Sequence, residues 1–334
     1  MKISHFLFFL MLTASLNLIT SCKPKTAKIG VLMHSYENER WSKDKDYLVD
    51  NLKQLGAEVM LDVADNDQQK QIAQASEMIK NGVQVLIVVP INSEEAGKIV
   101  DLAHESGVKV IAYDRLIKGS KLDYYVTANS THIGSLQATY MTTIQPKGKF
   151  ALIPGSKYDN NSMRLFLGQM NVLQPYMESG DIQLIYSEFT DGWTPEQGKF
   201  HANQILDQSS DSIDAIITGS DAIADGVLQV LKERGLEGKI KLAGQDAELD
   251  NIKAIMSGAQ TCDILKPLKE MARTTAELAF DIAMEKPINF QFTSESNGKA
   301  LVKSILIDAI VVNKNNIEST IVASGFHTSA DLNR

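Results

Sequence analysis

The sequence has little cysteine, no excess of positive charge, and no long apolar run beyond its first 21 residues. Its 334 residues include two cysteines, Cys22 and Cys262. No stretch after residue 21 has 18 consecutive apolar residues, which excludes a transmembrane helix in the body of the chain. The net charge is −8, and an acidic chain lacks the basic footprint that nucleic-acid partners require. We therefore expect a soluble body that binds no nucleic acid.

The signatures of several enzyme and cofactor classes are also missing. No G-x-G-x-x-G or G-x-x-x-x-G-K-[ST] loop is present to cradle a phosphate, and no G-x-S-x-G nucleophile elbow occurs. The six histidines show no metal-ligand spacing. Nothing in the sequence shows two carboxylates with pKa values pushed apart for acid–base catalysis. We therefore predict no catalytic residue, no metal site and no cofactor.

The first residues indicate export rather than fold. Lys2 supplies a positive charge, and Phe6 to Leu18 form an apolar stretch too short to span a bilayer. Ile19-Thr20-Ser21-Cys22 follows, and it resembles a bacterial lipoprotein processing site whose cysteine is lipidated and becomes the mature N-terminus. Residues 1–21 are then a signal peptide and residues 22–27 a tether. The alternative is an ordinary signal peptide with a cysteine there by chance.

The chain from Cys22 onward is acidic and long enough for two domains. Residues 1–21 carry one lysine and no acidic residue, so the net charge of the remaining 313 residues is −9. If Cys22 is lipidated, Cys262 is the only other thiol, and no disulfide can form within the chain. Cys262 lies in an apolar strand pattern, which predicts a small buried side chain rather than a nucleophile. The length exceeds what one hydrophobic core usually supports.

Short β-branched runs alternate with longer amphipathic stretches along the chain. Continuous apolar strands separated by helices are typical of a parallel sheet covered on both faces. Two such series predict an α/β protein with two doubly wound lobes. The expected helices are Trp41–Leu55, Gln68–Asn81 and Glu94–Glu105. The expected strands are Lys28–Met33, Glu58–Val63, Val83–Pro90, Val108–Tyr113, Lys149–Pro154, Gln183–Ser187, Ala215–Thr218, Lys241–Gly244 and Thr261–Leu265.

Polar and indole side chains follow the ends of these strands. Ligands of parallel sheets bind beyond the carboxyl ends of the strands, so these positions carry the functional signal. Carboxylates accept protons from sugar hydroxyls, Arg, Lys and Asn groups donate to sugar oxygens, and an indole covers an apolar C–H face. The groups that follow the strands are Glu39-Arg40-Trp41, Tyr113-Asp114-Arg115, Tyr158 to Asn161, Asp191-Gly192-Trp193, Ser220-Asp221, Gln245-Asp246 and Lys266.

Each of these residues also has a simpler interpretation. A single tryptophan is more often a packing residue, and a single charged residue is more often a solvated loop residue. Asp159 and Asp246 precede predicted helices, so each is also a candidate N-cap. The joint pattern, with both tryptophans of the chain beside charged strand-end residues, favours a site for a monosaccharide between the lobes.

Eight short segments in order resemble the periplasmic sugar-binding proteins of the ribose/galactose class, which serve ABC importers. Within that class the similarity is closest to the D-xylose-binding proteins, and it runs from about Lys28 to His327. The segments are Glu39 to Asp44, Tyr113-Asp114-Arg115, Asp159-Asn160-Asn161, Gly168-Gln169-Met170, Asp191-Gly192-Trp193, Gly244 to Ala247, Lys266-Pro267 and Val312 to Ile317.

The resemblance implies a role for each matching position. Hydrogen bonds to the sugar would come from Arg40, Asp114, Arg115, Asp159, Asn161, Asp246 and Lys266, and Trp41 and Trp193 would flank the ring. One position departs from the family, because Ser220 stands before Asp221 where the family's xylose pocket has asparagine. Losing one polar partner shifts affinity by roughly 1–3 kcal/mol, enough to change which pentose binds best.

The resemblance also implies the periplasmic-binding-protein type I fold, with three crossovers between its lobes. The N-terminal lobe would comprise residues 28–131 plus 267–305, and the C-terminal lobe residues 132–266 plus 306–330. The sugar would bridge both lobes and favour the closed arrangement, which a membrane ABC permease then recognises. We expect a monomer that is exported to the periplasm or cell surface and held to the membrane through lipidated Cys22.

Two other functions stay open on the same fold. One is a sensing module that presents the sugar to a membrane kinase or chemoreceptor, and the other is an enzyme that acts on a free aldose. A sugar-responsive repressor is excluded, because residues 1–27 read as signal and tether rather than as a helix-turn-helix.

Overall fold

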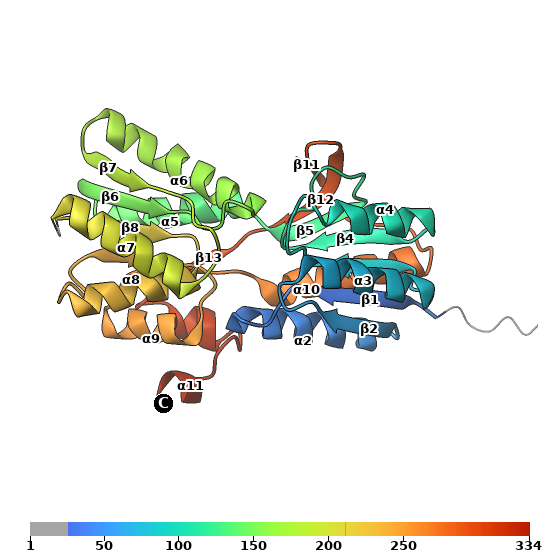
Figure 1. The fold of residues 1–334 in the computed structure, drawn as a ribbon. Helices are drawn as coiled ribbons and strands as arrows, with labels where there is room; N and C mark the ends of the chain where they lie inside the picture. The colour runs from blue at the N-terminus through green and yellow to red at the C-terminus, as the bar shows by residue number, and fades with distance from the viewer. Residues whose placement is uncertain (1–25, 211) are drawn as a thin grey trace, which may run out of the picture.

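The computed structural model describes residues 26–210 and 212–334, which form two lobes side by side (Figure 1). Each lobe contains one β-sheet with helices on both faces. The prediction of an α/β protein with two doubly wound parallel sheets is therefore confirmed. The predicted signal peptide and the Cys22 lipidation site lie outside the described residues.

The first lobe contains a seven-stranded sheet in the order β11-β12-β5-β4-β3-β1-β2. Neighbouring strands are parallel except at the edge, where β11 runs antiparallel to β12. All four residues of β3 are buried, as expected for a strand covered on both faces. The strands are β1 (Lys28–Met33), β2 (Glu58–Val63), β3 (Val85–Val88), β4 (Lys109–Tyr113), β5 (Tyr124–Ala128), β11 (Thr293–Ser296) and β12 (Leu301–Ile307).

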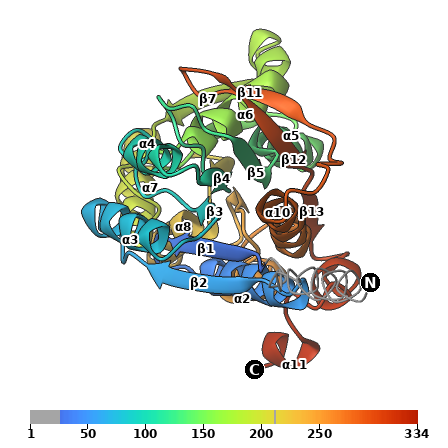
Figure 2. The same cartoon turned by 90° about the vertical axis from the view of Figure 1, so that its right-hand side faces the viewer.

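Two pairs of helices cover the faces of this sheet (Figure 2). Helices α2 (Glu39–Gln54) and α10 (Leu268–Ala283) pack on one face, where Leu48 and Met271 belong to one apolar cluster. Helices α3 (Gln68–Lys80) and α4 (Gly97–Glu105) pack on the other, where Met78 and Ile99 belong to a second cluster. The helix from late in the chain thus completes a lobe that is otherwise built from its beginning.

The second lobe contains a six-stranded sheet in the order β13-β10-β9-β8-β6-β7. Its strands are parallel except β13, which runs antiparallel to β10. Helices α5 (Ser130–Ile144) and α6 (Asn160–Glu178) lie on one face, and α7 (Pro195–Ser209) and α8 (Asp221–Glu233) on the other, with α9 (Leu249–Ser257) beside α8. The strands are β6 (Gly148–Ile153), β7 (Ile182–Ser187), β8 (Ala215–Thr218), β9 (Lys241–Ala243), β10 (Cys262–Leu265) and β13 (Ile310–Asn313).

The chain passes between the two sheets three times. It crosses after β5, again between β10 and α10, and a third time between β12 and β13. The residue limits given above for the lobes stay a prediction. A π-helical turn, η1 (Glu318–Val322), and a short helix, α11 (Ser329–Leu332), end the chain, and α11 packs against α9.

Two glycines bring α5 and α6 of the second lobe close together, and buried amides join these helices to the sheet. Gly134 of α5 and Gly168 of α6 face one another, and a Cβ atom on either would lie 2.0 Å from a backbone oxygen of the other helix. Gln169 donates a hydrogen bond to Gln137, whose own amide donates to the carbonyls of Thr218 and Gly244, each at 2.9 Å. These bonds fix the ends of β8 and β9, where polar residues of the predicted site begin.

The expected elements agree with the observed ones to within a few residues, but four strands were not foreseen. β1, β2 and β8 have the predicted limits, whereas α2 begins two residues earlier than expected, at Glu39. The sequence patterns did not predict β5, β11, β12 or β13.

Cys262 is fully buried, as expected, and burial raises the pKa of its thiol. No helix among the described residues is long and apolar enough to span a bilayer.

Candidate functional site

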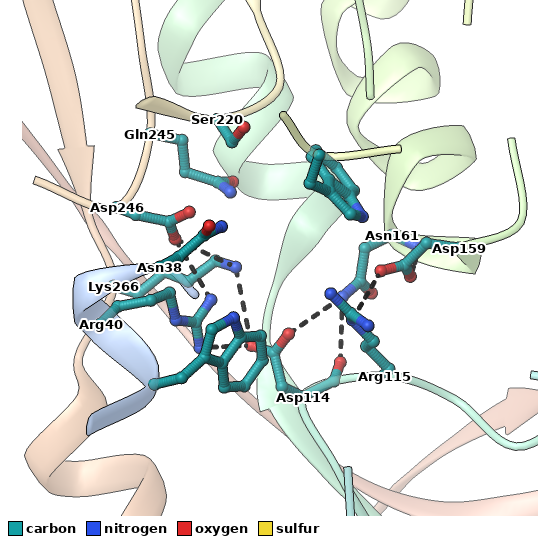
Figure 3. Close-up of a pocket in the computed structure, with 12 residues that line it drawn as sticks. Asn38, Arg40, Asp114, Arg115, Asp159, Asn161, Ser220, Gln245, Asp246 and Lys266 are labelled. Carbon is teal, nitrogen blue, oxygen red and sulfur yellow. Dashed lines mark hydrogen bonds and ion pairs between the residues drawn. The ribbon is translucent and has the colours of Figure 1, made fainter. Parts of the chain in front are cut away.

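A polar cavity lies between the lobes, at the carboxyl ends of both parallel sheets (Figure 3). It contains about 340 Å³ of space that protein atoms do not occupy, part of which is open to solvent. It is lined by Asn38, Arg40, Trp41, Asp114, Arg115, Asp159, Asn161, Trp193, Ser220, Gln245, Asp246 and Lys266.

The first lobe supplies two short segments to this cavity. Arg40 and Trp41 lie in the first turn of α2, and both side chains are buried. Asp114 and Arg115 directly follow β4. Asp114 has a φ of 62°, a left-handed conformation that non-glycine residues rarely adopt. This turn directs the backbone carbonyl of Asp114 to the hydroxyls of Tyr125 and Thr127, which donate to it at 2.9 and 2.8 Å.

The second lobe contributes the beginnings of three helices and the ends of two strands. Asp159 caps α6 by accepting from the backbone N–H of Asn161 at 2.9 Å. Ser220 caps α8, and Trp193 precedes the first residues of α7. Gln245 and Asp246 follow β9, and Lys266 follows β10 at one of the crossovers between lobes.

Arg40 lies at the centre of the charged groups. Its guanidinium contacts three carboxylates: Asp44 and Asp114, each with an oxygen 2.9 Å from Nη2, and Asp246, whose Oδ1 lies 3.2 Å from Nη1. Lys266 Nζ lies 3.5 Å from Asp114 and 3.4 Å from Asp246. Behind Arg40, the hydroxyl of Tyr113 donates to Asp44. Acidic and basic side chains from both lobes therefore meet in one buried cluster.

A second group of contacts joins the lobes on the other side of the cavity. Arg115 Nε lies 3.1 Å from Asp159 Oδ2, and the side-chain amide of Asn161 donates to the carbonyl of Asp114 at 3.0 Å. In Figure 3 these side chains lie on the opposite side of the cavity from Asp246, Lys266 and Arg40. The structure therefore represents a closed arrangement of the lobes.

The neighbouring charges control the protonation of the carboxylates that line the cavity. Burial alone would raise the pKa of Asp114, but the positive charges of Arg40, Lys266 and Arg115 outweigh it and hold the pKa below its ordinary value. Burial raises the pKa of Asp159, and Arg115 opposes the rise. Asp114 therefore stays ionised through the physiological range and accepts hydrogen bonds.

The two indoles are held differently. Trp41 contacts the guanidinium carbons of Arg40 and Arg115, which lie 4.1 and 5.3 Å from its ring centroid, and the edge of His34 packs against it. Trp193 is partly exposed, and its buried Nε1 donor has no partner among the described residues. Gly155 leaves room for its ring, since a Cβ there would lie 2.1 Å from two ring carbons.

This chemistry fits a neutral ligand that is rich in hydroxyl groups. The cavity combines three cations, Arg40, Arg115 and Lys266, with three carboxylates, Asp114, Asp159 and Asp246. An anionic ligand would face all three carboxylates, whereas hydroxyls donate to the carboxylates and accept from the cations. Among the described residues, no group of three or more His, Cys, Asp or Glu side chains is arranged to hold a metal ion.

All ten residues predicted to contact a ligand line this one cavity, although their contacts with a sugar stay a prediction. Two lining residues were not predicted as contacts, Asn38 and Gln245. Gln245 is among the strand-end residues noted in the sequence, whereas Asn38 gave no signal beyond preceding a helix. The N-cap interpretation of Asp246 is wrong, because α9 begins only at Leu249 and the Asp246 side chain contacts Arg40 and Lys266.

Comparisons with known proteins agree with this architecture. Residues 29–287 match the family model described as a periplasmic binding protein domain. The chain belongs to the periplasmic binding proteins. This family binds solutes without converting them, so the protein is not an enzyme, and the alternative of an aldose-acting enzyme is withdrawn.

Three relatives of this binding protein match it over more than nine tenths of its length. It is 37% identical to the D-xylose-binding periplasmic protein of Escherichia coli K12 over 332 residues, covering 99% of this chain and 100% of the relative. It is 30% identical to the multiple sugar-binding periplasmic receptor of Rhizobium radiobacter, covering 91% and 92%. A solute-binding protein of an ABC transporter from Clostridium phytofermentans, crystallised with β-D-glucose, superposes with a TM-score of 0.82 at 28% identity, covering 91% and 99%.

Proposed function

We propose that this protein captures a monosaccharide, D-xylose by preference, in the cleft between its lobes and delivers it to an ABC sugar importer. The observation that carries this proposal is the buried, charge-balanced cluster to which both lobes contribute. Arg40, Asp114 and Arg115 come from one lobe, and Asp159 and Asp246 from the other. Relatives named for D-xylose at 36–37% identity support the choice of sugar.

A ligand that contacts both lobes stabilises the closed arrangement, because it loses half of its contacts when the lobes separate. Closure also removes water from the site and strengthens each hydrogen bond. The permease then distinguishes loaded from empty protein by shape. The protein acts as a monomer in this scheme, with all sugar contacts supplied by one chain.

A thermal-shift screen of aldoses on the chain from Lys23 onward tests the proposal. A sugar at 100 times its dissociation constant stabilises the folded protein by about 2.7 kcal/mol. D-xylose should give the largest upward shift in melting temperature among the pentoses and hexoses. If no monosaccharide raises the melting temperature, the proposed function is wrong.

We also propose that Cys22 is lipidated and holds the protein to the membrane. The experiment is to express the full chain and a Cys22→Ser variant and to compare the mass and membrane association of each product. The wild type should carry acyl chains and sediment with membranes, whereas the variant should be unmodified and released. An unmodified wild-type cysteine would contradict the anchor.

A sensing role is a second candidate, because one relative at 30% identity is described as a receptor. Both roles use the same sugar-bound closed form and differ only in the membrane partner. Crosslinking of the sugar-loaded protein in its own membranes separates them, since the importer proposal predicts an ABC permease as the captured partner and sensing predicts a kinase or chemoreceptor.

A further inference from the structure

A pair of buried carboxyl groups lies next to the cavity, in the second lobe. Asp221, the first residue of α8, and Asp263, in β10, are both fully buried. Their carboxyl groups lie together beside Gly244. Gly244 leaves the space they need, because a Cβ there would lie 2.2 Å from Asp221 Oδ1 and 2.8 Å from Asp263 Oδ2.

The hydrogen bonds around the pair indicate which partner carries a proton. Asp263 accepts from three N–H groups: Ala247 at 3.0 Å, Ile264 at 2.7 Å and the amide of Gln260 at 2.8 Å. Asp221 Oδ2 accepts from the backbone N–H of Glu248 at 2.8 Å, whereas its Oδ1 is buried with no N–H donor. Asp263 thus has the environment of an ionised carboxylate, and a proton on Asp221 Oδ1 completes the pair.

The two carboxyls together hold the segment that carries Asp246. Asp263 binds the N–H of Ala247, and Asp221 binds the N–H of Glu248. Asp246 and Ala247 have φ values of 105° and 55°, left-handed conformations that non-glycine residues rarely adopt and that persist only when the surrounding structure enforces them. This turn places the Asp246 carboxylate beside Arg40 and Lys266.

We propose that Asp221 and Asp263 share one proton and act as positioning residues for sugar binding, because they lock the Asp246–Glu248 turn in the conformation that presents Asp246 to the ligand. The inference rests on the proposed sugar-binding function. When the shared proton leaves at alkaline pH, two adjacent buried charges repel one another, the turn relaxes, and Asp246 moves from its place in the cavity.

The surroundings of the pair favour retention of this proton. Burial raises the pKa of Asp221 well above its ordinary value, and the negative charges of Asp263 and Glu248 raise it further. Burial likewise raises the pKa of Asp263 to about 6, with Asp246 adding to the rise. The Cys262 thiol also lies near Asp263, and burial together with the negative charge of Asp263 raises the pKa of this thiol well above its ordinary value. Arg40 and Lys266 contact Asp246 from the cavity side.

Variants at position 221 can keep or remove its contacts with Asp263 and with the N–H of Glu248. Asp221→Asn keeps the shape of the protonated side chain, since its amide donates to Asp263 while its oxygen accepts from Glu248. Asp221→Ala removes both bonds. Glu248→Gln serves as the control, because the Glu248 side chain is outside the cavity but its charge acts on the pair.

Calorimetric titration of the mature protein with D-xylose, from about pH 6 to about pH 9.5, tests the proposal. The affinity of the wild type for D-xylose should fall by at least about tenfold between the neutral and the alkaline end of this range. The affinity of Glu248→Gln should also fall at alkaline pH. Asp221→Asn should retain neutral-pH affinity to within about threefold and show no alkaline loss, whereas Asp221→Ala should bind at least about tenfold more weakly at every pH. A flat wild-type profile, or an alkaline loss in Asp221→Asn equal to that of wild type, would overturn the proposal.

Melting of the unliganded proteins supplies a readout that needs no sugar. Because the folded state holds the shared proton more tightly than the unfolded state does, wild-type stability falls as pH rises. The melting temperature of Asp221→Asn should rise relative to that of the wild type as pH increases. If the difference between the two melting temperatures is the same at every pH, the pair does not share a proton. If the wild type bound no aldose at any pH, the proposed function would fail, and the melting comparison would still decide the state of the pair.

Discussion

Arg40 at the start of α2 and Asp246 in the turn after β9 form an ion pair across the cleft, with 3.2 Å between Nη1 and Oδ1. The two residues are 206 positions apart and belong to different lobes. Arg40 has two further carboxylate partners in its own lobe, so its charge stays compensated when the lobes separate. The pair therefore joins the lobes without leaving a bare buried charge in the open form.

Removing Asp246 or Arg115 should weaken sugar binding strongly while the protein still folds. Truncating one partner of a buried, hydrogen-bonded charge pair costs about 2–5 kcal/mol of binding, so Asp246→Ala and Arg115→Ala should each weaken affinity by at least about 30-fold. Calorimetry with D-xylose measures the loss, and circular dichroism checks the fold. Asp250→Ala and Arg273→Ala, at exposed positions, are the controls and should bind like wild type. Wild-type affinity in either site variant would contradict the assignment of the site.

A side chain at position 155 should displace the indole of Trp193. Gly155 has a φ of +111°, and an added Cβ would lie 2.1 Å from the Trp193 ring, so Gly155→Ala both strains the backbone and shifts the ring. Affinity should fall by about tenfold or more. The tryptophan fluorescence of a Trp41→Phe background, in which Trp193 is the only indole, should change on sugar binding and lose that response in Gly155→Ala. The exposed Gly56→Ala, with a similar positive φ and open space around it, controls for strain alone.

Exchange of Ser220 for asparagine should alter the choice of sugar more than the strength of binding. The Ser220 hydroxyl is buried and caps α8 only weakly, with 3.4 Å between its oxygen and the N–H of Ile223. Asparagine also caps helices well and adds an amide that both donates and accepts. Ser220→Asn should change the ratio of affinities for D-xylose and other pentoses by at least about fivefold. An unchanged ratio would show that this position does not contact the sugar.

The stability of the unliganded protein should fall as pH rises from about 4.5 to about 8. Burial raises the pKa of Glu248 from its ordinary 4.5 to about 8, with the charges of Asp246 and Asp225 contributing. The folded state binds this proton more tightly than the unfolded state does. The free energy of unfolding is therefore greatest below pH 4.5, the ordinary pKa, and falls as the pH rises through about 8, the pKa in the folded state. Denaturant unfolding should show a fall of about 2–4 kcal/mol, reduced in Glu248→Gln. A variant with an unchanged pH profile would show that Glu248 does not cause the dependence.

The sequence predicts best the strands that alternate with helices along the chain. β8 (Ala215–Thr218) is a continuous apolar run between helices, and its limits were foreseen. β5 contains two tyrosines and a threonine, and β12 alternates buried and exposed residues, so neither resembles the other strands of the parallel series. β5 and β12 pair with one another although they are far apart in the sequence, and the periodicity of a sequence does not reveal such a pairing.

The site was predictable to the extent that it follows from topology. Polar residues at the carboxyl ends of parallel strands converge, and this rule locates Asp114, Asp246 and Lys266 on one cavity. Which charged residues contact one another depends on tertiary packing, so the contact between Arg40 and Asp246 could not be predicted from the sequence. The Asp221–Asp263 pair was hidden for the same reason, since a buried carboxyl looks in sequence like any other helix-start or strand aspartate.

A crystal structure of the mature protein with D-xylose tests the central claim most directly. We predict one sugar between the two indoles, with its hydroxyls within hydrogen-bond distance of Arg40 and Asp114 from the first lobe and of Asp159 and Asp246 from the second. A sugar bound elsewhere, or one that contacts a single lobe and leaves the other lobe's charged side chains empty, would contradict the account.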